Sequence, residues 1–271
     1  MACVPREISK RRISGRGIAG KGPTPGRILF AALTASLVAA AEPATAATCA
    51  SLAGLELPDT MITSAESFNG GTYTAPDNEV FTNLPAFCRI AATLTPTSDS
   101  NIKIEVWMPA SGWDGRYFGT GNGNIGGVIV YGALASGVFF NVAVANTDMG
   151  TSPAATQGGR VLTGHPEKQI DYATRSTHLM TVRSKEIIEA FYGEAPKYSY
   201  FNGCSTGGGQ AIHEALQFPA DYDGILAFAP SMNSTHIGAV REWDAQAILR
   251  WRRRPQLPPP SSSNAPARTG A

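Results

Sequence analysis

The sequence of 271 residues has few charged residues, only four cysteines and no long hydrophobic run. Its apolar stretch at 28–41 is shorter than the roughly 20 residues that a membrane-spanning helix needs. Lysine and arginine nearly balance aspartate and glutamate, 22 against 21, and the formal net charge is +1. This balance gives no reason to expect a nucleic acid as a partner. With 43% hydrophobic residues, the chain can still bury one sizeable core.

The N-terminal segment is typical of an export signal. Basic residues from Lys10 to Arg27 precede the apolar stretch, and the small residues at 44–47 fit a cleavage site for a signal peptidase. We therefore interpret residues 1–47 as a targeting segment. The mature chain is expected to be secreted or periplasmic, without membrane contact, and the pair Arg11–Arg12 leaves the export route open.

Three cysteines follow this segment. Cys49 and Cys88 form the natural disulfide pair, because a bond between them ties down the mature N-terminus. Cys204 is then expected to be unpaired, directly before Ser205. An odd number of cysteines in an exported protein leaves one cysteine without a disulfide partner in the same chain.

The pattern after residue 100 alternates strands with helices, which predicts a mostly parallel α/β sheet. Residues 49–100 are interpreted as loop-rich. A helix is expected at 167–192, ended by Gly193 and Pro196, and a second one at 207–218. The expected strands are 101–109 with one buried face, a short strand that enters the glycine-rich loop 119–127, and three more at 138–148, 198–202 and 223–230.

The composition changes near residue 250. Residues 250–271 combine basic residues, proline and serine with little apolar surface, so we expect a disordered tail. The α/β core is therefore placed at 48–249.

Residues 203–207 read Gly-Cys-Ser-Thr-Gly and fit the pattern G-x-S-x-G between an expected strand and an expected helix. This context makes Ser205 a candidate nucleophile. A glycine-rich turn could also hold a phosphate, but no lysine follows the glycines, which excludes a Walker loop.

Backbone amides near Ser205 are candidates for an oxyanion hole. The N–H of Thr206 lies at the start of the expected helix, where the helix dipole favours negative charge. A second donor is expected in the loop 119–127, from Gly121, Asn122 or Gly123.

A serine nucleophile also needs a base and a carboxylate that orients this base. The histidines after Ser205 are His213, expected on a helix surface, and His236, expected in a loop. Neither they nor the earlier His165 and His178 are assigned this role. The aspartates at 148, 221 and 223 are not assigned either.

The chain resembles the tannase/feruloyl esterase family, secreted α/β-hydrolases that cleave esters of aromatic acids. The resemblance extends from about Cys49 to Ile237 and is most specific in two segments, GHPEKQIDY and YFNGCSTGGGQAIHEALQFPADYDGILAFAP. It implies an α/β-hydrolase fold, a small aromatic ester as substrate and Ser205 as the nucleophile. It also implies that Cys204 pairs with a cysteine beside the catalytic histidine.

The family continues with a lid domain that binds calcium and substrate, then the catalytic aspartate, then a His-Cys pair. These segments are not found in this sequence, so we expect a fold that is incomplete at its C-terminus, with no cofactor or metal in this chain. Two functions stay open. One is an ester hydrolase of tannase/feruloyl esterase type, and the other is a non-catalytic truncated fragment or pseudo-enzyme.

Overall fold

The computed structural model describes residues 47–153 and 158–252. The chain divides into two compact units at Pro230/Ser231. The expected targeting segment lies, except for Ala47, outside the described residues. The expected boundary at 249/250 falls inside helix α6 (Ser234–Arg252), and the rest of the expected tail, 253–271, is outside the described residues.

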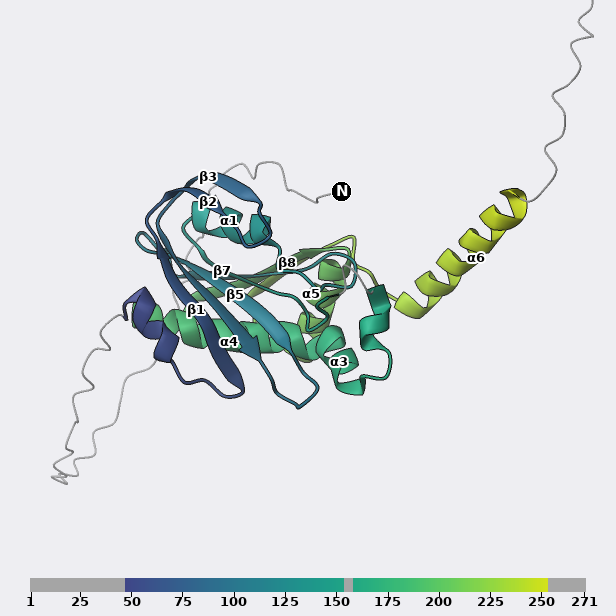
Figure 1. Cartoon of the computed structure of the whole chain (residues 1–271), viewed down its shortest axis with the longest axis horizontal. Helices are drawn as coiled ribbons and strands as arrows, with labels where there is room; N and C mark the ends of the chain where they lie inside the picture. The colour runs from purple at the N-terminus through teal and green to yellow at the C-terminus, as the bar shows by residue number, and fades with distance from the viewer. Residues whose placement is uncertain (1–46, 154–157, 253–271) are drawn as a thin grey trace, which may run out of the picture. The chain divides into compact units, whose positions relative to one another are not determined.

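A seven-stranded sheet forms the centre of the first unit, with strand order β1-β4-β5-β7-β6-β8-β9 (Figure 1). Two further strands, β2 (Gly71–Thr74) and β3 (Val80–Leu84), pair with each other. The strands of the large sheet are β1 (Thr60–Phe68), β4 (Phe87–Leu94), β5 (Ile102–Pro109), β6 (Arg116–Thr120), β7 (Ala143–Thr147), β8 (Tyr198–Cys204) and β9 (Gly224–Phe228).

The sheet is mixed rather than mostly parallel. The pairs from β7 through β6 and β8 to β9 are parallel, whereas the pairs that link β1, β4, β5 and β7 are antiparallel. Parallel neighbours need a crossover connection, and a helix lies in each of the crossovers after β6, β7 and β8. The short connection between β4 and β5 allows an antiparallel pair instead.

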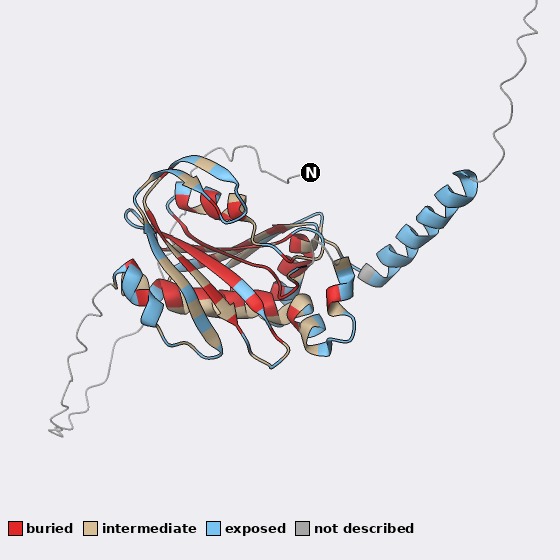
Figure 2. Cartoon of the chain, viewed as in Figure 1, coloured by how far each residue is buried: buried red, intermediate tan, exposed pale blue. Residues whose placement is uncertain are grey.

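Helices cover both faces of the sheet (Figure 1). Helices α4 and α5 pack with the 3-10 helix η1 on one face, and α1 packs with β2 and β3 on the other. Figure 2 shows buried residues along the central strands and on α4. The helical segments of this unit are η1 (Cys49–Gly54), α1 (Tyr131–Phe139), η2 (Gly158–Leu162), α3 (Pro166–Ile170), the π-helical turn η3 (Asp171–Arg175), α4 (Ser176–Tyr192) and α5 (Thr206–Gln217).

The interpretation of residues 49–100 as loop-rich is wrong, because this segment contains β1 to β4. Its threonines and serines suit a pleated surface that is half exposed. In β4, buried residues alternate with half-buried ones, and β1 at the end of the sheet is more exposed. The polar composition therefore reflects the exposed edge strand β1 and the separate pair of β2 and β3, and not an absence of strands.

Three other expectations differ from the structure in extent. The strand expected at 138–148 is only β7, because α1 continues to Phe139. Strand β5 is buried on both faces, since α4 and η1 cover one face and α1 with β2 and β3 covers the other. Its buried Glu105 is paired with Arg89 at 2.6 Å. Strand β9 is partly exposed, with Leu226 at 49%, because it is the last strand of the described sheet.

The helix expected at 167–192 is confirmed in position, but it is built from α3, the turn η3 and α4. It ends at Gly193, which takes the left-handed conformation, as expected for a helix C-terminus. The disulfide between Cys49 and Cys88 is also confirmed, with a Cα–Cα distance of 5.5 Å, and it joins η1 to β4. In the two described ranges, no helix has the length and apolar character needed to cross a membrane.

Candidate active site

Ser205 occupies a sharp corner between β8 and α5. Its backbone angles are φ 60° and ψ −119°, in a region that residues with a side chain rarely adopt. The corner is held from both sides, because the Ser205 N–H donates to the Phe228 carbonyl at 3.1 Å and the Ser205 carbonyl accepts from the Gly209 N–H at 3.0 Å. The side chain is exposed and does not cap the helix. The hydroxyl is thus presented to solvent at the C-terminal end of a parallel strand.

Glycines let the loop after β6 approach this corner closely. A Cβ atom on Gly121 would lie 2.5 Å from the Cα of Gly207 and 3.1 Å from the Cα of Gly203. In the same way, a Cβ on Gly203 would lie 2.2 Å from the carbonyl oxygen of Gly207. A Cβ on Gly207 would lie 3.0 Å from backbone atoms of Asn122, so both flanking glycines of the G-x-S-x-G pattern stand where backbone passes too close for a side chain.

The structure restricts the expected oxyanion donors. The N–H of Gly121 donates to the Asn202 carbonyl at 2.9 Å, and the N–H of Asn122 donates to Oε1 of Gln210 at 2.8 Å. Both N–H groups therefore already have an acceptor within the fold and are not available as oxyanion donors. Of the expected loop donors, Gly123 stays a prediction. So does Thr206, whose N–H lies in the first turn of α5, where amides lack acceptors within the helix.

A buried polar network, which sequence reasoning missed, positions the loop. Gln210 is 4% exposed, and its Nε2 donates to Oγ1 of Thr177 on α4 at 2.8 Å. Nδ2 of Asn122 donates to the carbonyls of Thr147 and Val128, at 2.7 and 3.1 Å. The signal in the sequence is a polar residue at position 210 on the helix face that also carries Gly207, Ala211 and Glu214, all of which are buried.

Asp148, directly after β7, holds the other end of the same loop. Its Oδ1 accepts the N–H groups of Lys103 at 2.9 Å and Gly150 at 2.8 Å, while its carbonyl accepts the N–H of Gly127 at 2.8 Å. Burial raises the pKa of this carboxyl group above its usual range. The carboxyl group orders the backbone beside the site and does not reach Ser205 through a hydrogen bond.

Each histidine has a partner other than Ser205. Within the described residues, no hydrogen bond joins a histidine ring to the Ser205 hydroxyl. His213 is exposed on α5, as expected, whereas His236 lies in α6 and not in a loop. The ring contacts through Nδ1 are His165 with Asp99 at 2.8 Å, His178 with Asp221 at 2.7 Å, His213 with Gln217 at 3.4 Å and His236 with Asn233 at 2.8 Å.

Cys204, the last residue of β8, is disulfide-bonded. The prediction that it is unpaired is therefore wrong. That prediction counted only the cysteines after the expected cleavage site, and such a count carries no information on which sulfur atoms meet in a fold. A bonded sulfur at this position leaves Ser205 without a competing thiol beside it.

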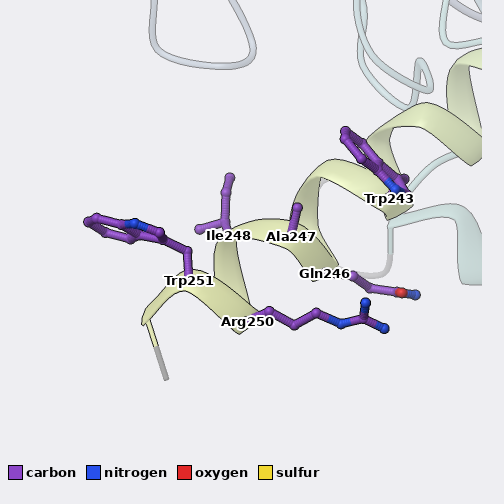
Figure 3. A pocket seen from close by; sticks show the side chains of 6 residues that line it. All are labelled: Trp243, Gln246, Ala247, Ile248, Arg250 and Trp251. Atoms are coloured by element: carbon purple, nitrogen blue, oxygen red, sulfur yellow. The ribbon is translucent and has the colours of Figure 1, made fainter. Parts of the chain in front are cut away.

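The second unit contains a pocket that consists of one helix surface (Figure 3). The lining side chains project from neighbouring turns of α6, and all of them are exposed. They offer neither a nucleophile nor a carboxylate, so this pocket is no candidate for ester chemistry. The lining residues are Trp243, Gln246, Ala247, Ile248, Arg250 and Trp251.

Residues 88–261 match the protein family described as "Tannase and feruloyl esterase". The chain is 37% identical over 221 residues to an uncharacterized esterase of Xanthomonas campestris, which covers 82% of this chain and 38% of that protein. It is 39% identical over 189 residues to a probable feruloyl esterase B-2 of Aspergillus flavus, which covers 68% of this chain and 32% of that protein. The chain thus spans less than two fifths of the length of these relatives.

Solved structures show the same fold. An esterase from Aspergillus oryzae superposes with a TM-score of 0.63 at 32% identity, over 69% of this chain and 38% of that one. Feruloyl esterase B from the same organism gives a TM-score of 0.59 at 32% identity, over 68% and 37%. A tannin acyl hydrolase from Aspergillus niger, at 20% identity and a TM-score of 0.52 over 65% and 34%, shows likeness of fold alone. The first unit therefore has an α/β-hydrolase fold.

Proposed function

Because the chain belongs to the tannase and feruloyl esterase family, we propose that it functions as a carboxylic ester hydrolase with Ser205 as its nucleophile. The observation that carries this proposal is the corner at Ser205. The hydroxyl is exposed at the end of a parallel strand, and the backbone there holds a positive φ of 60°. This is the geometry in which an α/β-hydrolase presents its nucleophile to an ester carbonyl.

The backbone around the corner supports the second part of the proposal, stabilisation of the oxyanion. The N–H of Thr206 lies at the positive end of the α5 dipole, and the N–H of Gly123 lies in the loop that packs on the same corner. The hydroxyl of Thr206 also donates to the Asn124 carbonyl, which joins this loop to the helix start. Both amides thus belong to a backbone that is ordered before any substrate binds.

The proposed substrates are esters of aromatic acids. Relatives that are 39% and 32% identical to this chain over the matched residues carry the name feruloyl esterase. Methyl ferulate and methyl gallate are therefore the first substrates to compare with an alkyl acetate. A preference for the acetate would contradict the aromatic assignment while leaving the nucleophile in place.

A non-catalytic role is the second candidate, and one observation favours it. Within the described residues, no histidine hydrogen-bonds to Ser205, and a serine hydroxyl without a base is a weak nucleophile at neutral pH. The oxyanion donors alone would then leave only a small residual rate.

One experiment separates the two candidates. The full chain and Ser205→Ala are incubated with 4-nitrophenyl ferulate, with and without imidazole as an external base, and acylation is mapped by mass spectrometry. The hydrolase proposal expects an acyl group on the peptide that contains Ser205, faster with imidazole and absent in the variant. No adduct on that peptide, even with imidazole, would overturn it. Turnover that in both proteins does not exceed the rate without protein would identify the chain as non-catalytic.

We also propose that the protein is exported. The disulfide between Cys49 and Cys88 supports this proposal, because such bonds persist in oxidising compartments. Fractionation of cells that express the full chain should find it outside the cytoplasm. Recovery of the protein only from the cytoplasm, with reduced cysteines, would contradict export.

A further inference from the structure

Three metal-ligand side chains converge on the face of the sheet that α4 and α5 cover. His178 comes from α4, Glu214 from α5, and Asp221 from the turn before β9. Each offers one ligand atom, and the three atoms lie within 4.8 Å of one another. Glu214 is about 13 Å farther along α5 than Ser205, at 1.5 Å per residue. The cluster is therefore separate from the candidate active site.

Glu214 is the unusual member of this cluster. The residue is 1% exposed, and its Oε2 has no hydrogen-bond partner. A carboxylate oxygen that is buried without a partner is costly, so a group that satisfies it is expected. One oxygen of the Glu214 carboxylate lies within 4.8 Å of a ligand atom of His178 and of one of Asp221. This carboxylate is therefore part of the cluster and does not lie in an apolar part of the core.

The two other side chains are held in place and reachable from solvent. The His178 ring stacks on Phe218 with centroids 3.8 Å apart, and its Nδ1 contacts Oδ2 of Asp221 at 2.7 Å. The side chains of His178 and Asp221 are 29% and 14% exposed. A cation can therefore enter from the surface and keep water as a further ligand.

We propose that His178, Glu214 and Asp221 bind a divalent transition-metal cation, with Zn²⁺ as the probe. One imidazole nitrogen and two carboxylate oxygens form a common donor set for zinc. Bonds of about 2.0–2.2 Å to the metal bring tetrahedral ligand atoms to roughly 3.4 Å from one another. Ligand atoms already within 4.8 Å reach this arrangement by small side-chain rotations. The contact between His178 and Asp221 is then exchanged for bonds to the cation.

One neighbouring charge opposes the cation. Lys185 donates from Nζ to the Asp221 carbonyl, so its ammonium group lies beside the cluster. Two carboxyl side chains lie in the cluster against this single positive charge, and Asp223 lies close enough to act on Lys185 as well. Burial and the neighbouring Asp221 raise the pKa of Glu214, so a cation that binds here displaces a proton from this side chain.

The cation would join α4, α5 and the turn before β9 to one another. It would stabilise the fold behind the Ser205 corner, and it would have no part in ester chemistry. The proposal does not depend on the proposed function, and it departs from the expectation of no metal in this chain.

The test uses the full chain after treatment with a chelator that is then removed. Zinc is titrated against a chromophoric competitor, and the melting temperature is measured with and without zinc. We expect one zinc per chain and a higher Tm with zinc, since a ligand that binds only the folded state stabilises it. Glu214→Gln and Asp221→Asn should both lose the zinc and the Tm shift.

A matched control exists in the same chain. His165 contacts Asp99 at 2.8 Å, as His178 contacts Asp221, and this pair belongs to no three-residue cluster among the described residues. His165→Gln should keep the zinc stoichiometry and the Tm shift of the wild type.

Two results would overturn the proposal. One is a wild-type chain that takes up no zinc, and the other is uptake that persists in Glu214→Gln. If the wild type binds no zinc and the Tm of Glu214→Gln differs from that of the wild type, the two carboxyl groups of Glu214 and Asp221 share a proton instead. If a variant does not fold, the visible absorption of Co²⁺ added to the wild type still decides, because intense bands report a low-coordinate site built from protein ligands and weak bands report a hydrated ion.

Discussion

Oε1 of Gln210 accepts the backbone N–H of Asn122 at 2.8 Å, although the two residues are 88 positions apart. This bond fixes the loop after β6 against the inner face of α5. The same side chain reaches Thr177 on α4 through its Nε2. One buried amide side chain thus joins three segments around the Ser205 corner.

The first prediction concerns this amide. Gln210→Leu leaves the N–H of Asn122 and the hydroxyl of Thr177 buried without their partner, and each such group costs about 1–3 kcal/mol. We expect the free energy of unfolding in urea to fall by about 2–4 kcal/mol. Gln217→Leu on the exposed face of the same helix should change it by less than about 0.5 kcal/mol. Equal effects of both substitutions would contradict the role of the network.

The second prediction concerns the close approach of backbones. Gly121→Ala places a Cβ 2.5 Å from the Cα of Gly207, where only backbone could move to relieve the clash. We expect a loss of about 1–3 kcal/mol in the free energy of unfolding. Gly123→Ala in the same loop meets no atom within 4 Å and is the control for the stability measurement. The packing argument does not survive if Gly121→Ala is as stable as this control.

The third prediction concerns pH. Because burial raises the pKa of Asp148 in the folded state, the folded protein binds this proton more tightly than the unfolded chain does. The stabilising contribution is present below the ordinary aspartate pKa of about 3.9 and is lost as the pH rises through the folded pKa. Asp148→Asn removes this component while its side-chain oxygen can still accept the two backbone N–H groups.

Unfolding experiments at several pH values test this sign. Relative to wild type, Asp148→Asn should gain stability as the pH rises from the ordinary aspartate range towards neutrality. Asp77→Asn, in an exposed turn, is the control and should follow the wild type. A difference between Asp148→Asn and wild type that stays constant with pH would rule out the buried carboxyl group as its cause.

The fourth prediction concerns the outer strand of the described sheet. β9 pairs on one side with β8, and Leu226 on it is 49% exposed. A strand with a free edge and exposed apolar side chains favours association between chains. Leu226→Lys should therefore lower the fraction of self-associated chain in sedimentation velocity. Leu216→Lys, at an exposed site on α5, should not. Equal sedimentation of all three proteins would exclude β9 as the cause of association.

Local patterns in the sequence determined the parts of the protein that depend on neighbours along the chain. The corner at Ser205 follows from glycines that flank it, a strand before it and a helix after it, and the end of α4 follows from Gly193. The pair Cys49–Cys88 could also be predicted, because a bond between these two cysteines ties down the mature N-terminus. Composition was misleading for the exposed strands β1, β2 and β3, since an exposed strand carries the same polar residues as a loop.

Only the tertiary structure decided which distant side chains meet. The contact of Gln210 with Asn122 and the cluster of His178, Glu214 and Asp221 join segments whose separation in sequence has no periodic signature. The hydrogen bonds from the N–H groups of Gly121 and Asn122 to their acceptors depend on the same packing. The physical reason is that hydrogen bonds and ligand sets between elements are set by where the helices dock on the sheet. The propensities of single residues determine only that these helices and strands form.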